Sequence, residues 1–175
     1  MPNYCENDLY VSGAEADVEE FLEFVGMNKP RPEFDFNCVL PYPEEFAKRD
    51  DDRPDFNDPE YKAKMLVFRE KYGSNEDGFN SGGYEWCIKN WGTKWDAKDV
   101  VRRDYYGNVC ITFQTAWSPP LPVIKALAAK FPNLTLSLEY FESGVEVCGG
   151  VCYPAREDEE SPREWRDMYY GNRGG

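Results

Sequence analysis

The order of hydrophobic periods near the start of the chain constrains its fold more than any other feature. The stretch "NDLYVSG" places Leu9 and Val11 on one face and ends at a glycine, a pattern that is typical of a β-strand. The next stretch, "SGAEADVEEFLEFVG", has apolar residues at helical spacing: Val18, Phe21, Leu22 and Val25. Ser12 and Glu15 fit a capping box before this run. The chain is therefore predicted to begin with a strand followed by a helix over residues 14–25.

Similar periods predict the other elements. They are a strand over 34–40, helices over 59–73 and 84–90, a hairpin of strands over 98–105 and 109–117, a helix over 120–131, and strands over 134–142 and 145–153. The first part of segment 43–83, rich in proline and acidic residues, predicts a loop with at most one helical turn. We expect one domain over residues 1–155, with an insertion at 43–83, followed by a charged C-terminal tail over 156–175.

This order of elements contains two strand–helix–strand units. Two such units match the split βαβ, ferredoxin-like arrangement, an α+β fold whose sheet is mainly antiparallel and has its helices on one face. Helices 14–25 and 120–131 should then lie on the same face of the sheet. The helical insertion, which leads into a tryptophan-rich stretch, is expected to cover part of the other face.

Negative charge is concentrated in the first third of the chain. Residues 1–60 hold 17 acidic and 5 basic residues, a net charge of −12, whereas the whole chain has a net charge of −13. Such a surface repels phosphate, so direct nucleic-acid binding is not expected, and a protein with a basic surface is a more suitable partner. The residues predicted to form this acidic face are Glu15, Glu19, Glu20, Glu23, Asp50, Asp51 and Asp52.

The residues that most catalytic sites require are missing from the sequence. The chain has no histidine, which excludes Ser-His-Asp and Cys-His catalysis and every metal site with a histidine ligand. It also has no glycine-rich phosphate-binding loop. Cys148 and Cys152 would lie about 13 Å apart on a strand, so they do not predict a zinc site. We therefore expect a protein without catalytic residues, cofactor or metal.

Two features predict the location of the protein. The start "MPNYCENDLY" has neither the basic region nor the apolar core of a secretory signal, and no apolar run approaches the ~20 residues that span a bilayer. We expect a cytoplasmic protein without membrane contact, whose six cysteines are reduced thiols.

The stretch "NWGTKWDA" has two tryptophans four residues apart, and two interpretations of it remain open. In the first, Trp91 and Trp95 close one end of the core while Lys94 extends into solvent; replacing either tryptophan by alanine would then lower stability by ~3 kcal/mol or more. In the second, Trp91, Lys94 and Trp95 form an aromatic floor with one cation, suited to a nucleotide-like or anionic ligand.

Three stretches resemble one known family. "MPNYCENDLYVSG", "NWGTKWDA" and "TAWSPPLPVIKALAAKFPNLTLSLEYFE" are similar, in this order, to motifs of the YubB ferredoxin-like proteins of phages and conjugative plasmids. The resemblance covers roughly residues 1–42 and 84–153, and Tyr4 stands where tryptophan is commoner. It implies a ferredoxin-like fold and an origin in a mobile genetic element, and it carries over no catalytic residue.

These observations together predict a binding protein. We expect a phage or plasmid protein that engages a host protein through its acidic surface. It would inhibit a host defence system, as anti-CRISPR proteins do. The alternative is a small-ligand binder that sequesters a nucleotide through the "NWGTKW" region.

Overall fold

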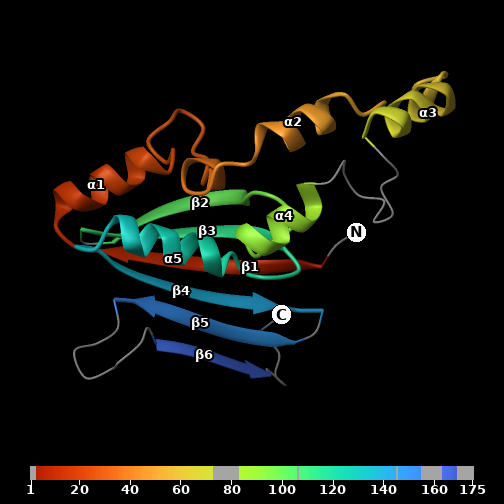
Figure 1. Ribbon diagram of the computed structural model, residues 1–175. Helices are drawn as coiled ribbons and strands as arrows, with labels where there is room; N and C mark the ends of the chain where they lie inside the picture. The colour runs from red at the N-terminus through yellow and green to blue at the C-terminus, as the bar shows by residue number, and fades with distance from the viewer. Residues whose placement is uncertain (1–2, 73–82, 106, 145, 155–162, 169–175) are drawn as a thin grey trace.

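The computed structural model describes residues 3–72, 83–105, 107–144 and 146–154, and the backbone of 163–168 (Figure 1). Its centre is a six-stranded sheet in the order β2-β3-β1-β4-β5-β6, in which every neighbouring pair is antiparallel. The strands are β1 (Tyr4–Ser12), β2 (Lys98–Tyr105), β3 (Asn108–Ala116), β4 (Thr135–Glu142), β5 (Val147–Tyr153) and β6 (Arg163–Met168). The helices are α1 (Glu15–Phe24), α2 (Glu44–Asp51), α3 (Tyr61–Tyr72), α4 (Gly83–Asn90) and α5 (Leu121–Lys130).

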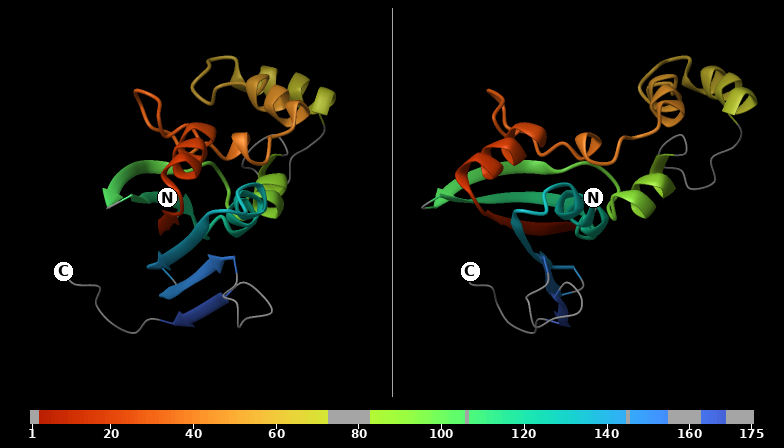
Figure 2. Two further views of the ribbon diagram at one scale, coloured as in Figure 1. Left: turned by 90° about the vertical axis from the view of Figure 1, so that its left-hand side faces the viewer. Right: turned by 60° about the vertical axis from the view of Figure 1, so that its left-hand side comes forward.

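The ferredoxin-like arrangement is confirmed. Elements β1, α1, β2, β3, α5 and β4 follow one another along the chain, and their strands lie in the order β2-β3-β1-β4. Helices α1 and α5 cover the same face of the sheet, as predicted, because Phe21 and Phe131 pack edge to face with ring centroids 5.3 Å apart (Figures 1 and 2).

The core lies between this helix pair and the sheet. Alternate residues of the central strands point into it, including Leu9, Ile111 and Leu138, which are fully buried. The opposite face is open to solvent, with Tyr10 and Tyr105 both more than two-fifths exposed. The alternation that predicted the strands therefore reflects a sheet covered on one face.

Residues 34–40 do not form the predicted strand; Phe36–Cys38 form a 3-10 helix, η1. The Asp35 carboxylate accepts a hydrogen bond from the Asn37 N–H at 2.9 Å, and the Phe36 N–H donates to the Asp96 carboxylate at 3.0 Å. These bonds turn the backbone away from a strand, although Phe34 and Phe36 are both buried. The sheet position that we assigned to this segment is taken by β2.

The inserted segment also differs from the prediction. Residues 44–51 form a two-turn helix, α2, because Glu44 and Glu45 in its first turn and Lys48 and Arg49 in its last turn favour a helix. Trp86 of α4 packs against the core on the helix side of the sheet, so the expected cover of the open face is wrong for the described residues.

The start of helix α1 and the C-terminal segment also differ from the prediction. The N-cap of α1 is Ala14 and makes no side-chain hydrogen bond, so the Ser12 capping box is not formed. Arg163–Met168, which we assigned to the tail, pair with β5 as strand β6. Backbone pairing at a sheet edge does not require an apolar period, which is why the sequence pattern missed this strand. The limits of the domain remain a prediction.

Within the part of the chain that the structure describes, no helix combines the length and apolar character needed to cross a membrane.

Candidate functional site

Two sequence motifs meet at one end of the sheet. The Thr93 hydroxyl, fully buried, donates a hydrogen bond to the Ala116 carbonyl at 2.9 Å and accepts one from the Ala116 N–H at 3.0 Å. The Ser118 hydroxyl donates to the Gly92 carbonyl at 2.6 Å. Three hydrogen bonds thus join the "NWGTKW" stretch to the "TAWSPP" stretch. The Thr93 hydroxyl bonds to both backbone groups of Ala116, as a neighbouring strand would.

Trp91 is part of the core. Its side chain is 5% exposed, and its indole N–H donates to the Leu40 carbonyl at 2.8 Å. Its ring lies edge to face against Phe36 and Trp86, with centroids 5.9 and 5.5 Å away. Trp91 therefore fits the first interpretation, in which this tryptophan closes one end of the core.

Lys94 and Trp95 lie nearer the surface, in a group that the sequence analysis did not assemble. The Lys94 ammonium lies 4.7 Å from the ring centroid of Trp95 and 5.3 Å from that of Trp117. The Lys98 ammonium lies 4.5 Å from the Trp95 ring. Burial, and the positive charge of Lys98, lower the pKa of Lys94. We call these four residues the lysine–tryptophan cluster; its role in ligand binding remains a prediction.

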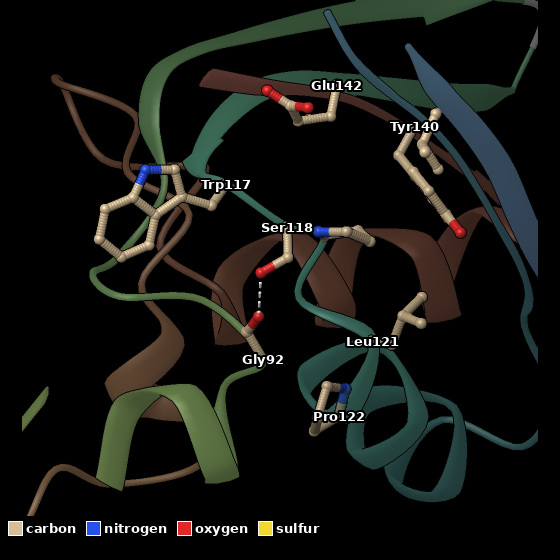
Figure 3. A pocket seen from close by; sticks show the side chains of 9 residues that line it. Gly92, Trp117, Ser118, Leu121, Pro122, Tyr140 and Glu142 are labelled. Carbon is tan, nitrogen blue, oxygen red and sulfur yellow. Dashed lines mark hydrogen bonds between the residues drawn. The ribbon is translucent and has the colours of Figure 1, made fainter. Parts of the chain in front are cut away.

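A pocket of about 420 Å³ opens beside the junction of the two motifs (Figure 3). We call it the sheet-end pocket. Trp117 and Ser118 of the β3–α5 turn, Leu121 of α5, and Tyr140 and Glu142 of β4 contribute to its walls. The signal in the sequence is the run "TAWSPPLP", but neither the pocket nor Glu142 could be predicted from it.

The predicted acidic residues form two separate groups. Glu15, Glu19, Glu20 and Glu23 lie on α1, whereas Asp50, Asp51 and Asp52 lie at the end of α2, toward the other end of the molecule (Figure 1).

The two groups also differ in their internal contacts. Asp50 accepts a hydrogen bond from the Tyr42 hydroxyl at 2.7 Å, and Asp52 is bonded to the Lys71 ammonium at 2.7 Å and to the Tyr72 hydroxyl. On α1, the Glu19 carboxylate lies 3.8 Å from the Arg102 guanidinium. The α2 group is therefore tied largely into the packing of α2 on its neighbours.

A second hollow, of about 440 Å³, has a strongly acidic lining and lies between the loop after α1 and the start of β2. Glu33 and Asp35 come from the loop, and Asp96 and Asp99 come from the segment leading into β2. We call it the acidic hollow. The acidic hollow and the α1 carboxylates meet the same strand: Asp99 and Arg102 both belong to β2, and Arg102 contacts Glu19.

Asp96 is the partly buried carboxylate of the acidic hollow. Its carboxylate accepts hydrogen bonds from the backbone N–H groups of Phe36 at 3.0 Å and of Ala97 at 2.8 Å. Burial raises the pKa of Asp96 to about 6, and the nearby Asp35 carboxylate adds to this increase. This site could not be predicted from the sequence, because only the fold brings residues 33–35 and 96–99 together.

This pKa predicts how stability depends on pH. Between about pH 4, near the ordinary pKa of an aspartate, and about pH 6, the folded chain binds a proton that the unfolded chain releases, so stability is lost as the pH rises. Relative to the Asp96→Asn variant, which keeps an acceptor oxygen, the wild type should lose about 1–2 kcal/mol of unfolding free energy between about pH 4 and about pH 7. Urea denaturation at several pH values measures this difference. A difference that stays constant with pH would contradict it.

One family model agrees with the ferredoxin-like fold. Residues 90–168 match the family model described as the ferredoxin-like domain in Api92-like protein. Among solved structures, the chain is similar to the crystal structure of protein api92 from Yersinia pseudotuberculosis, with 11% sequence identity, coverage of 94% of this chain and 98% of that chain, and a TM-score of 0.49. No match to a curated protein was found. The matched segment contains all of the "NWGTKW" stretch and all of the "TAWSPP" stretch, and the chain thus contains a ferredoxin-like domain similar to that of Api92-like proteins.

Proposed function

We propose that this chain is a non-catalytic protein of a phage or plasmid, located in the host cytoplasm, that binds a host protein with a basic surface. We further propose that the bound protein belongs to a defence system, which the chain inhibits in the manner of an anti-CRISPR protein. The origin and the inhibitory role rest on the resemblance to the YubB family. The binding mode rests on the acidic hollow.

The observation that carries the binding mode is the convergence of four carboxylates, Glu33, Asp35, Asp96 and Asp99, on one hollow. A lysine or arginine side chain that entered it would meet carboxylate oxygens on several sides, and charge-assisted hydrogen bonds of this kind are about twice as strong as neutral ones. The raised pKa of Asp96 also fits a site that gains from a cation, because a positive neighbour would favour the charged carboxylate. The α1 carboxylates would extend the same negative field and speed association.

Three variants, each lacking two negative charges, test this proposal. Glu33→Gln with Asp99→Asn alters the hollow, Glu20→Gln with Glu23→Gln alters α1, and Glu45→Gln with Asp51→Asn alters α2. Asparagine tolerates the positive φ of 50° at residue 99. The tagged proteins capture partners from a host lysate, mass spectrometry identifies the protein retained, and its affinity is then measured with purified material at several salt concentrations.

We expect the hollow variant to lose the most affinity, about tenfold at low salt, and the α1 variant to lose less. Both effects should shrink as salt increases, because exposed charges are screened. The α2 variant should match the wild type. Equal affinity of all four proteins at low salt would refute the acidic hollow as the binding site, and a loss confined to the α2 variant would move the site to α2.

The lysine–tryptophan cluster favours a second function, the binding of a nucleotide-like ligand. Lys94 and Lys98 place two ammonium groups against the face of Trp95, within a chain that is acidic overall. Two cations beside an exposed aromatic surface could bind phosphate and stack a base. A thermal-shift screen with nucleotides tests this, and Lys94→Ala with Lys98→Ala should abolish any shift. No shift with any nucleotide would exclude this function for the compounds screened.

A further inference from the structure

The sheet-end pocket is a preformed cavity on a different part of the fold from the acidic hollow. Its volume of about 420 Å³ lies within the range of about 300–1,000 Å³ that is typical of small-molecule sites. It opens where β4 ends, β5 begins and α5 starts, and its walls combine the Trp117–Ser118 turn and the Tyr140 side chain with apolar side chains of α5 and β5 (Figure 3).

The turn that carries Trp117 is held in a strained conformation. Trp117 has a positive φ of 66°, which is rare for a bulky side chain and costs on the order of 1–3 kcal/mol. Three hydrogen bonds hold the turn: the Trp117 N–H donates to the Asn3 carbonyl at 3.0 Å, the Thr115 hydroxyl donates to the Ser118 carbonyl at 2.8 Å, and the Ser118 hydroxyl donates to the Gly92 carbonyl. Strain maintained in this way is a feature of ligand sites, and it holds the Trp117–Ser118 turn at the edge of the pocket before any ligand arrives.

The charge of the lining decides which ligands fit. Glu142 is 4% exposed and is the one lining residue among the described part of the chain with a charged side chain. Its carboxylate accepts a hydrogen bond from the Gly144 N–H at 3.0 Å, which orients it. A carboxylate in an apolar surrounding interacts strongly with a cation, because the effective dielectric constant there is low.

The start of α5 does not offer the usual site for an anion. Helix N-termini bind anions through free backbone N–H groups, but Pro119, Pro120 and Pro122 have none. The N–H groups of the next two turn positions are engaged: Leu121 donates to Pro119, and Val123 donates to Pro120. The pocket therefore favours a cation over an anion.

We propose that the sheet-end pocket binds an ammonium or guanidinium group carried on an apolar stem. The Glu142 carboxylate accepts hydrogen bonds from the cation, while Leu121 and Val147 contact the stem. The same chemistry occurs in free amines and in lysine or arginine side chains of polypeptides. This proposal does not depend on the acidic hollow, which is lined by other residues.

The test uses the whole chain and three defined probes: phenethylamine, agmatine, and a blocked tripeptide with a central arginine. Phenethyl alcohol, which has the same ring and stem without the charge, is the neutral control. Binding is measured by calorimetry and located by NMR through the Trp117 indole N–H, assigned with Trp117→Phe. Glu142→Gln removes the pocket carboxylate. Glu139→Gln, on the same strand but exposed, removes the same charge outside the pocket.

We expect at least one cationic probe to bind and to shift the Trp117 signal, with at least tenfold lower affinity for phenethyl alcohol and for the Glu142→Gln variant. Glu139→Gln should bind as the wild type does. Preference for the tripeptide would identify a polypeptide side chain as the source, and preference for the amines would identify a free metabolite. Failure of all three probes to bind, equal binding of amine and alcohol, or equal losses in the two variants would overturn the proposal. If Glu142→Gln does not fold, the amine–alcohol comparison and the Trp117 signal still decide it.

Discussion

Replacing Trp91 by alanine should lower the free energy of unfolding by about 4 kcal/mol, the range for large aromatic truncations in a core. The side chain is 5% exposed and packs against Phe36, Tyr42 and Trp86, so its removal leaves a cavity among segment 36–42, α4 and the core. The Leu40 carbonyl would also lose the indole N–H that donates to it at 2.8 Å. Urea denaturation followed by far-ultraviolet circular dichroism measures the loss without relying on tryptophan fluorescence.

Two neighbouring substitutions are matched controls. The sequence predicted equal losses for Trp91 and Trp95, but Trp95 is only partly buried, so Trp95→Ala should cost about 2 kcal/mol or less. Lys94→Ala should cost less than about 1 kcal/mol. A Trp91→Ala protein within about 1 kcal/mol of the wild type would show that Trp91 does not anchor segment 36–42 and α4 to the core.

The sequence predicted those parts of the fold that local periodicity determines. Strand β1, helices α1 and α5, the β2–β3 hairpin and strands β4 and β5 all have a clear period, and all form close to the predicted bounds. Segment 34–40 misled this reasoning because alternating burial has the same pattern in a strand and in an irregular segment. Its conformation depends on a hydrogen bond between Phe36 and Asp96, 60 residues further along the chain, which no local pattern can reveal.

The sequence indicated which residue types the candidate sites contain, but it did not indicate where these residues lie in the fold. The concentration of acidic residues was evident, but the internal partners of Asp50 and Asp52, and the convergence of Glu33 with Asp99, depend on tertiary structure. The "NWGTKW" and "TAWSPP" stretches stand out in the sequence, but the hydrogen bond between Thr93 and Ala116 that joins them is a long-range contact. Composition can therefore indicate the chemistry of a surface, while only the fold determines which side chains share it.

Replacing Gly92 by alanine should destabilise the chain by about 3 kcal/mol. Gly92 has a φ of +81°, and an added Cβ would lie 2.8 Å from Pro122 Cδ and 3.0 Å from the Pro119 carbonyl oxygen. The left-handed backbone alone costs about 1–2 kcal/mol for a residue with a Cβ, and overpacking adds about 1–3 kcal/mol. Neither neighbour can move easily, because a proline ring and a backbone carbonyl are both fixed by the first turn of α5.

Gly107→Ala separates these two contributions. Gly107 has a φ of +84°, nearly the same as that of Gly92, but an added Cβ there would have no atom within 4 Å. It should therefore cost about 1 kcal/mol, from the backbone conformation alone. The difference between the two variants, measured by urea denaturation, gives the steric cost of separating the "NWGTKW" stretch from α5. If the two alanine variants lose the same stability, the contact between Gly92 and the Pro119–Pro122 turn is not tight, and the junction depends on the Thr93 hydrogen bonds instead.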